Sequence, residues 1–190
     1  MGRRTWPLLT RIHAVTVVEL SLPGVKLLTP TLHRDHRGHF AELFTAAELE
    51  AAGLPSRFAQ ANLSHSLPGV VRGLHYQDDP PQGKLVSCVA GSIFDVVADI
   101  NPESETYSRH VAVELDASTR QSLWVPAGYA HGFAVTGGDE ATVLYYVDAP
   151  YQPGSERGIA WNDPSLAIAW PVREPILSDR DQRHPLLKSV

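Results

Sequence analysis

Three side chains that can carry a positive charge interrupt one apolar stretch of the sequence. Arg72, His75 and Lys84 lie in VVRGLHYQDDPPQGKLVSCV, whose Val and Leu residues are typical of buried β-strands, and we expect its two apolar runs to form a local strand pair. Cationic groups beside a core are costly unless an anion or a reacting group uses them. A histidine can act as a general base near neutral pH, and Arg or Lys can bind phosphate or stabilise an oxyanion. The trio therefore indicates acid–base chemistry, although His75 taken alone would more often be a satisfied core histidine.

The nine histidines of the chain also raise the question of a metal site. His75 and His131, in VPAGYAHGF, each lie at the border of an apolar strand and could share a metal ion. Metal-binding β-barrels of this kind supply a His-x-His pair, a Glu and a later His, but Gln77 stands at the second position and Lys84 adds a repelling charge. The other cluster, HRDHRGHF, is typical of a solvated turn. We therefore expect no metal and no other cofactor.

A largely β scaffold must position these residues. Short runs rich in Val, Ile, Leu and aromatic residues alternate with Gly, Pro, Asn and Asp. The predicted strands are GVKLLTPTLH, FAQANLSHS, GVVRGLHYQ, GKLVSCVAGSIFDVVADI, RHVAVELD, QSLWVPAG, AHGFAVTG and ATVLYYVD. SIFDVVADI alternates with the period of two of a strand, and Ala90-Gly91 before it predicts a tight hairpin. Many short strands at this spacing favour a sandwich or a small barrel.

One helix stands out between the strands. TAAELEAAG has a capping box formed by Thr45 and Glu48, then good helix formers, then Gly53 as a stop signal. A further helical turn is predicted to begin at Asp163, with Pro164 at its first position. The sequence thus predicts a mainly β domain with one or two short helices.

Composition narrows the classes of function. A chain of 190 residues with 43% hydrophobic residues fits one domain, which we place at residues 16–190 after a loose N-terminal extension at 1–15. A net charge of −5 without charge blocks argues against binding to nucleic acid or to a membrane surface. A single cysteine, Cys88, is incompatible with an internal disulfide and favours a reducing compartment, so the cytoplasm is the expected location.

Several separated motifs together resemble one known family. GVVRGLHYQDDPPQGKLVSCVAGSIFDVVADI is followed by RQSLWVPAGYAHGFAV, LYYVDAPY, ERGIAWNDPSLAIAWP and LSDRD, in the order and spacing of the dTDP-4-dehydrorhamnose 3,5-epimerase family. The resemblance covers residues 17 to 185. It implies a cupin-type jelly roll that works as a metal-free homodimer. The implied reaction inverts C3 and C5 of dTDP-4-dehydro-6-deoxy-D-glucose and gives dTDP-4-dehydro-L-rhamnose.

The resemblance also implies four catalytic roles. His75 would be the base, and Asp181 of LSDRD would hydrogen-bond it and fix its tautomer. Tyr145 would be the acid on the opposite face of the sugar, and Lys84 would lie beside the C4 carbonyl oxygen. Removal of a proton next to a ketone requires a stabilised enolate, and inversion requires reprotonation from the other face, so these residue types suit the reaction. From sequence alone, however, Tyr145 could be a core aromatic residue and Asp181 a surface residue.

Substrate-binding positions follow from the same resemblance. They are Arg37, Glu42, Gln60, Asn62, Arg72, His131, Glu156 and Arg180. The arginines suit a diphosphate, because a guanidinium group matches phosphate oxygens. In the family the segment with Arg37 and Glu42 reaches the neighbouring subunit's site, and a solvated turn is the alternative.

Two positions depart from the family pattern and keep other functions open. Tyr146 stands where many members have Lys, and Pro150-Tyr151 replaces a tyrosine pair. Some members of the wider family invert only C3 or only C5, so a mono-epimerase is an alternative. The other alternative functions are a metal-dependent cupin isomerase or dioxygenase and a sugar-binding module without turnover.

Overall fold

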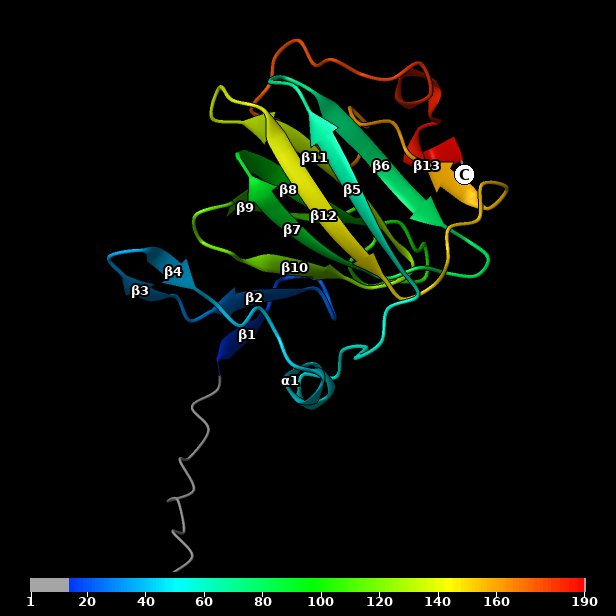
Figure 1. Cartoon of the computed structure of the whole chain (residues 1–190). Helices are drawn as coiled ribbons and strands as arrows, with labels where there is room; N and C mark the ends of the chain where they lie inside the picture. The colour runs from blue at the N-terminus through cyan, green and yellow to red at the C-terminus, as the bar shows by residue number, and fades with distance from the viewer. Residues whose placement is uncertain (1–13, 190) are drawn as a thin grey trace, which may run out of the picture.

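Two antiparallel β-sheets face each other and enclose the main core (Figure 1). The structure is a computed structural model that describes residues 14–189. The first sheet has the order β1 (Val15–Glu19), β2 (Lys26–Pro30), β10 (Ser122–Val125), β7 (Lys84–Ala90), β12 (Ala141–Val147) and β5 (Gln60–Ser66). The second has the order β13 (Glu156–Gly158), β6 (Val71–Gln77), β11 (Tyr129–Thr136), β8 (Ser92–Asp99) and β9 (His110–Asp116). From β5 to β8 the chain alternates between the sheets, which confirms the predicted mainly β jelly roll.

Each sheet buries side chains on both of its faces. Along β8, Ile93 and Val97 point into the core between the sheets, whereas Val96 and Ala98 point to the outer face. The C-terminal segment covers that outer face with Leu187. This arrangement confirms the predicted period of two and shows why SIFDVVADI is apolar on both faces.

The predicted helix is present and covers the outer face of the first sheet. α1 (Ala46–Ala51) begins at the capping box, in which the Thr45 side chain accepts from the Glu48 backbone and the Glu48 side chain accepts from the Thr45 backbone. Leu49 packs against Trp124 of β10 in a separate apolar cluster. Gly53 follows the helix with φ +70°, a conformation that favours glycine.

The segment at Asp163 forms the single helical turn that was predicted, closed by the Ala167 backbone N–H, which donates to the Asp163 carbonyl at 3.1 Å. Its carboxylate accepts hydrogen bonds from the backbone N–H groups of Ser165 and Leu166, as in an N-cap, but the chain leaves the helical path after one turn. Two short 3-10 helices end the described chain, η1 (Asp181–Arg183) and η2 (Leu187–Ser189).

Two predicted strand relationships are wrong. β7 and β8 do not form a hairpin at Ala90-Gly91, because β7 belongs to the first sheet and β8 to the second. The chain instead turns a corner at Gly91, where φ is +73° and an added Cβ would lie 2.2 Å from the Glu140 carbonyl oxygen. Likewise, β6 and β7 are not a strand pair. Arg72 and Lys84 therefore belong to opposite sheets.

The N-terminal region contributes an edge and a projecting arm. Residues 1–13 of the predicted extension lie outside the described residues, whereas Val15 is buried in β1. β3 (His33–Asp35) and β4 (Gly38–Phe40) form a small exposed hairpin that projects from the sandwich (Figure 1), where a solvated turn was predicted. None of the described helices is long and apolar enough to span a membrane.

Candidate active site

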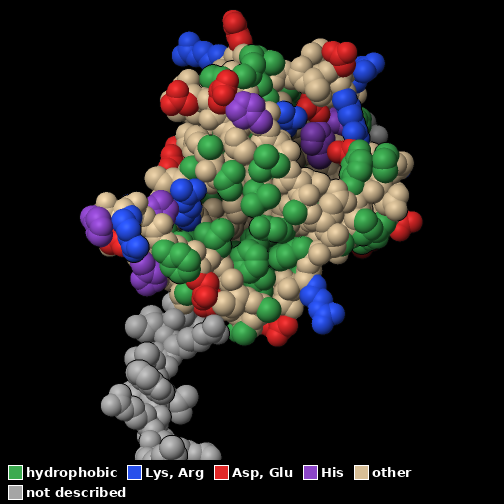
Figure 2. Space-filling view, in the orientation of Figure 1, with side chains coloured by type: hydrophobic (Ala, Val, Ile, Leu, Met, Phe, Trp, Pro, Cys, Tyr) green, Lys and Arg blue, Asp and Glu red, His purple; other side chains and the backbone are tan. Residues whose placement is uncertain are grey.

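A cavity of about 290 Å³ opens between the two sheets. Its lining residues are Asn62, Ser64, Arg72, His75, Gln82, Lys84, His131, Gly132, Phe133, Tyr145, Val147, Tyr151 and Glu156. Figure 2 shows histidine, basic and acidic side chains gathered at a recess near the end of the sandwich where β6 and β13 lie. Seven of the residues that the sequence marked out share this one cavity, namely Asn62, Arg72, His75, Lys84, His131, Tyr145 and Glu156.

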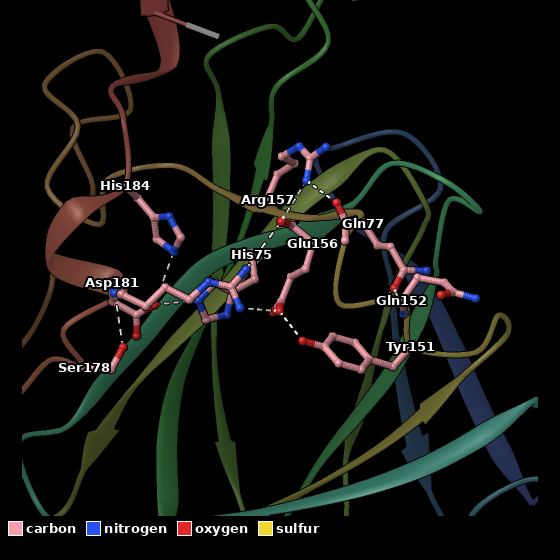
Figure 3. A network of polar contacts seen from close by, with 11 residues as sticks. His75, Gln77, Tyr151, Gln152, Glu156, Arg157, Ser178, Asp181 and His184 are labelled. Carbon is pink, nitrogen blue, oxygen red and sulfur yellow. Dashed lines mark hydrogen bonds and ion pairs between the residues drawn. The ribbon is translucent and has the colours of Figure 1, made fainter.

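His75 and Asp181 form a hydrogen-bonded pair on the second sheet's side of the cavity. His75 Nε2 lies 2.6 Å from Asp181 Oδ1, and the carboxylate is only 5% exposed (Figure 3). Burial works to raise the pKa of Asp181, but the hydrogen bond and charge of His75 and the Ser178 hydroxyl outweigh it and hold the pKa below its ordinary value. An ionised carboxylate accepts the Nε2 proton, which leaves Nδ1 of His75 with the lone pair of a base.

Tyr145 and Lys84 approach from the first sheet. The Tyr145 hydroxyl lies 3.3 Å from the Ser64 hydroxyl, and burial raises the pKa of the phenol far above its ordinary value, so the group keeps its proton. Burial lowers the pKa of Lys84, while the charges of Glu156 and Asp95 oppose that effect. None of the ion pairs within residues 14–189 includes Lys84, so its ammonium is available to a ligand.

His131 is held by a carboxylate that the sequence reasoning missed. Its Nε2 lies 2.9 Å from both oxygens of Asp95, which is fully buried. The His131 ring meets the Tyr145 ring edge to face at 6.3 Å. Asp95 had a visible signal, because the alternation in SIFDVVADI places this charge on the same inward face as Ile93 and Val97.

A second polar group stands at the cavity mouth. Glu156 accepts hydrogen bonds from the Tyr151 hydroxyl at 2.7 Å and from Arg180 (Figure 3). Burial works to raise the pKa of Glu156, but these two donors outweigh it and keep the pKa low. The structure thus brings the predicted Glu156 and Arg180 together, and adds Tyr151.

The other predicted binding residues divide between the cavity and the arm. Arg72 donates to the Ser66 hydroxyl and the His65 carbonyl, which aims its guanidinium at the mouth. Gln60 does not line the cavity but donates to Asn62 Oδ1 at 2.6 Å. Arg37 and Glu42 lie on and just after the β3–β4 hairpin, outside the cavity lining.

His184 is a second histidine beside Asp181. Its Nε2 lies 3.3 Å from Asp181 Oδ1, and His75, Asp181 and His184 place their ligand atoms within 4.8 Å of one another. Tetrahedral zinc with bonds near 2.0 Å separates its ligand atoms by roughly 3.3 Å. The 2.6 Å between His75 and Asp181 is instead a charge-assisted hydrogen bond, so the geometry suits proton transfer better than metal coordination.

Gln77, which replaces a possible metal ligand, has a structural role. Its amide nitrogen donates to the carbonyls of Pro80 and Pro150, and its oxygen accepts from the Gln152 backbone. These bonds tie the end of β6 to the loop that carries Tyr151.

Comparisons with known proteins point to one family. Residues 19–189 match the family model described as dTDP-4-dehydrorhamnose 3,5-epimerase. The enzyme of that name from Shigella flexneri is 45% identical over 169 residues, 88% of this chain and 93% of the relative. A dTDP-4-dehydrorhamnose 3-epimerase from Streptomyces niveus is 44% identical over 88% of this chain and 82% of its own. The crystal structure of a dTDP-6-deoxy-D-glucose-3,5-epimerase from Legionella pneumophila, in complex with dTDP-4-keto-L-rhamnose, matches with a TM-score of 0.88 at 39% identity, covering 93% of this chain and 94% of that one.

Proposed function

Because the chain belongs to the dTDP-4-dehydrorhamnose 3,5-epimerase family, we propose that it inverts C3 and C5 of dTDP-4-dehydro-6-deoxy-D-glucose and releases dTDP-4-dehydro-L-rhamnose. The observation that carries the proposal is the placement of His75 and Tyr145. One comes from β6 of the second sheet and the other from β12 of the first, and both line the same cavity. A base and an acid on opposite walls can remove a proton from one face of a sugar and return one to the other.

The proposed steps use only side chains of the cavity. Nδ1 of His75 takes the proton from the carbon next to the C4 ketone, and the C–H electron pair moves into a C=C bond while the C4 oxygen becomes an enolate. The Lys84 ammonium stabilises that negative charge. Tyr145 then donates its proton to the same carbon from the opposite face, and the enolate electrons form the new C–H bond as the C4 ketone is restored. His75 releases the abstracted proton to solvent, and the phenolate of Tyr145 regains one. The same sequence at the second carbon completes the double inversion.

The binding roles are part of the same proposal. Arg72 and Arg180 lie at the cavity mouth, where they suit the two phosphates of the nucleotide. Arg37 and Glu42 are carried by the projecting hairpin and would reach the cavity of a second copy in a homodimer. Exposed apolar side chains at Val18, Phe40 and Leu63 support such an interface, since burial of these groups is favourable.

Inversion of only one carbon is the alternative function, and the experiment must distinguish it from inversion of both C3 and C5. The Streptomyces niveus relative is named as a 3-epimerase, whereas the family model and the Shigella flexneri relative carry the 3,5-epimerase name. We therefore expect inversion at both carbons.

Proton exchange measured by NMR tests the proposal. The protein is incubated with dTDP-4-dehydro-6-deoxy-D-glucose in deuterated water, and loss of the C3 and C5 proton signals is followed. We expect loss at both positions, no loss with His75→Ala, and wild-type rates with His110→Ala on the edge strand β9. Exchange by His75→Ala at the wild-type rate would exclude His75 as the base, and exchange at C3 alone would indicate a mono-epimerase.

A further inference from the structure

The His184 side chain lies behind the His75–Asp181 pair and has no part in the steps above. Its Nε2 is 3.3 Å from Asp181 Oδ1, the oxygen that also accepts from His75 (Figure 3). The two imidazole rings meet edge to face at 5.4 Å. The side chain is 9% exposed, and its Nε2 is buried without a hydrogen-bond partner among the described residues. Such a group is costly to bury, so its position calls for an explanation.

The chain makes room for this ring at one glycine. A Cβ added at Gly158 would lie 2.4 Å from Cε1 and Nε2 of His184, so the ring fills the space that any side chain at position 158 would need. Gly158 pairs with His75 in the β13–β6 register, which places His184 over the strand that carries the proposed base.

The segment after His184 is fixed by two further contacts. The backbone N–H of Ala160 donates to the Pro185 carbonyl at 2.7 Å, and the backbone N–H of Leu187 donates to Asp163 Oδ2 at 2.7 Å. These bonds fix the backbone that follows His184, and the close packing of its ring against Gly158 restricts the side chain.

We propose that His184 is a positioning residue for the epimerase reaction, which, as the neutral Nε2–H tautomer, donates a second hydrogen bond to Asp181 Oδ1 during proton transfer. The proposal rests on the function proposed above for His75. A movement of about 0.3 Å would bring the 3.3 Å separation to an ordinary N–H···O length. With two donors on one oxygen, the carboxylate keeps its orientation while His75 changes between its neutral and charged forms.

Burial and the charges around His184 favour its neutral form. Burial and the positive charges of His75 on β6 and of Arg180 beside η1 lower the pKa of His184, against the attraction of Asp181. Burial works to raise the pKa of Glu156 on β13, and the positive charge of His75 is among the effects that outweigh it. A proton on His184 would place a second positive charge next to His75 and weaken its basicity. Activity should therefore require both histidines to be unprotonated.

The tautomer can be measured on the wild-type protein without turnover. Long-range ¹H–¹⁵N correlation spectra at pH 8 identify the protonated ring nitrogen of each histidine, and the spectrum of His184→Gln assigns the His184 signals by their absence. We expect a proton on Nε2. A proton on Nδ1 would overturn the proposal, because Nε2 would then have nothing to donate.

Kinetics provide the second test. Gln at position 184 keeps an N–H donor but does not titrate, whereas Phe keeps the volume and loses the donor. We expect His184→Gln to retain kcat within about threefold and His184→Phe to lose about tenfold in kcat with KM unchanged, the size of one hydrogen bond to a charged group. On the acid side, log(kcat/KM) should approach a slope of two in the wild type and of one in both variants. Gly158→Ala should resemble His184→Phe, because its Cβ displaces the ring.

The outcomes separate this proposal from the proposed function. A slope of two retained in His184→Gln, or wild-type kcat in a folded His184→Phe, would overturn the role of His184. If the wild type exchanged no substrate protons at all, the proposed function would fail, while the tautomer measurement would still decide whether His184 donates to Asp181.

Discussion

Replacing Asp181 by Asn is the sharpest test of the proposed dyad. Asn has nearly the same size as Asp, so the packing around the 3-10 helix η1 is retained while the negative charge is lost. The amide can also present its NH₂ group to His75, which would select the wrong tautomer. The backbone N–H of Asp181 donates to the Ser178 hydroxyl at 3.1 Å, and the substitution does not remove this donor.

The expected size of the effect follows from the geometry. When His75 takes the substrate proton it becomes an imidazolium, whose charge is centred roughly 4 Å from that of the carboxylate, and such a pair near a protein surface interacts by about 4 kcal/mol. Asp181 is 5% exposed and its contact with His75 is 2.6 Å, so solvent screens the pair little. Since each 1.36 kcal/mol corresponds to a tenfold change in rate, kcat should fall about 10³-fold.

The assay is deuterium exchange at C3 and C5 under saturating substrate, with Asp179→Asn as the matched control. Asp179 is exposed and lies two residues from Asp181. Its replacement by Asn removes the same charge from the same segment. We expect the control to retain wild-type kcat. If Asp181→Asn lost less than tenfold in kcat, the carboxylate would not act on His75 in the transition state, and the dyad would be a purely structural contact.

Three further predictions test the cavity and the core. Lys84→Met removes the cation proposed for the enolate and should lower kcat about 10²- to 10³-fold with dTDP binding retained, as measured by calorimetry. Burial raises the pKa of the Cys88 thiol to about 11, so the native protein should not react with a thiol reagent at pH 8 and should react once unfolded; reaction of the native protein would refute its burial. Asp163→Ala leaves three backbone N–H groups without an acceptor and should cost about 3 kcal/mol in urea unfolding at pH 7. Burial opposes ionisation of Asp163, but these hydrogen bonds hold its folded pKa below the ordinary value. The contribution is therefore complete above the unfolded pKa and is lost as pH falls through the folded one, so a stability difference between the two proteins that does not shrink as the solution is acidified would contradict this account.

Local signals in the sequence were reliable where neighbouring residues decide the structure. The capping box at Thr45 and Glu48 appears as a pair of reciprocal hydrogen bonds, and the alternation in β8 sends Val97 inward and Val96 outward. In both cases the interacting groups lie within a few residues, so the pattern itself contains the contact.

The pairing of strands, and the sheet to which each strand belongs, were harder to predict from the sequence. A hairpin turn and a corner between two sheets can use the same glycine, and only the partners of β7 and β8 distinguish them. For the same reason the sequence did not reveal that Arg72 and Lys84 come from facing sheets. His184 and Asp95 were missed because each gains its meaning from a residue far along the chain, 109 positions from His75 to His184 in the first case. Asp95 nevertheless left a trace as a charge on an apolar face.

The two-sheet construction bears directly on the proposed chemistry. Facing sheets lie about 10 Å apart, which leaves room for one sugar ring between side chains that extend from each wall. The separation of His75 and Tyr145 is then set by the packing of the core rather than by a mobile loop. Phe133 belongs both to that core and to the cavity lining, so it couples the spacing of the sheets to the site. The walls of the cavity also shield Lys84 from bulk water, and a cation stabilises an enolate more strongly where the medium is less polar. The cost of burying the lysine and the benefit of its position thus have the same physical origin.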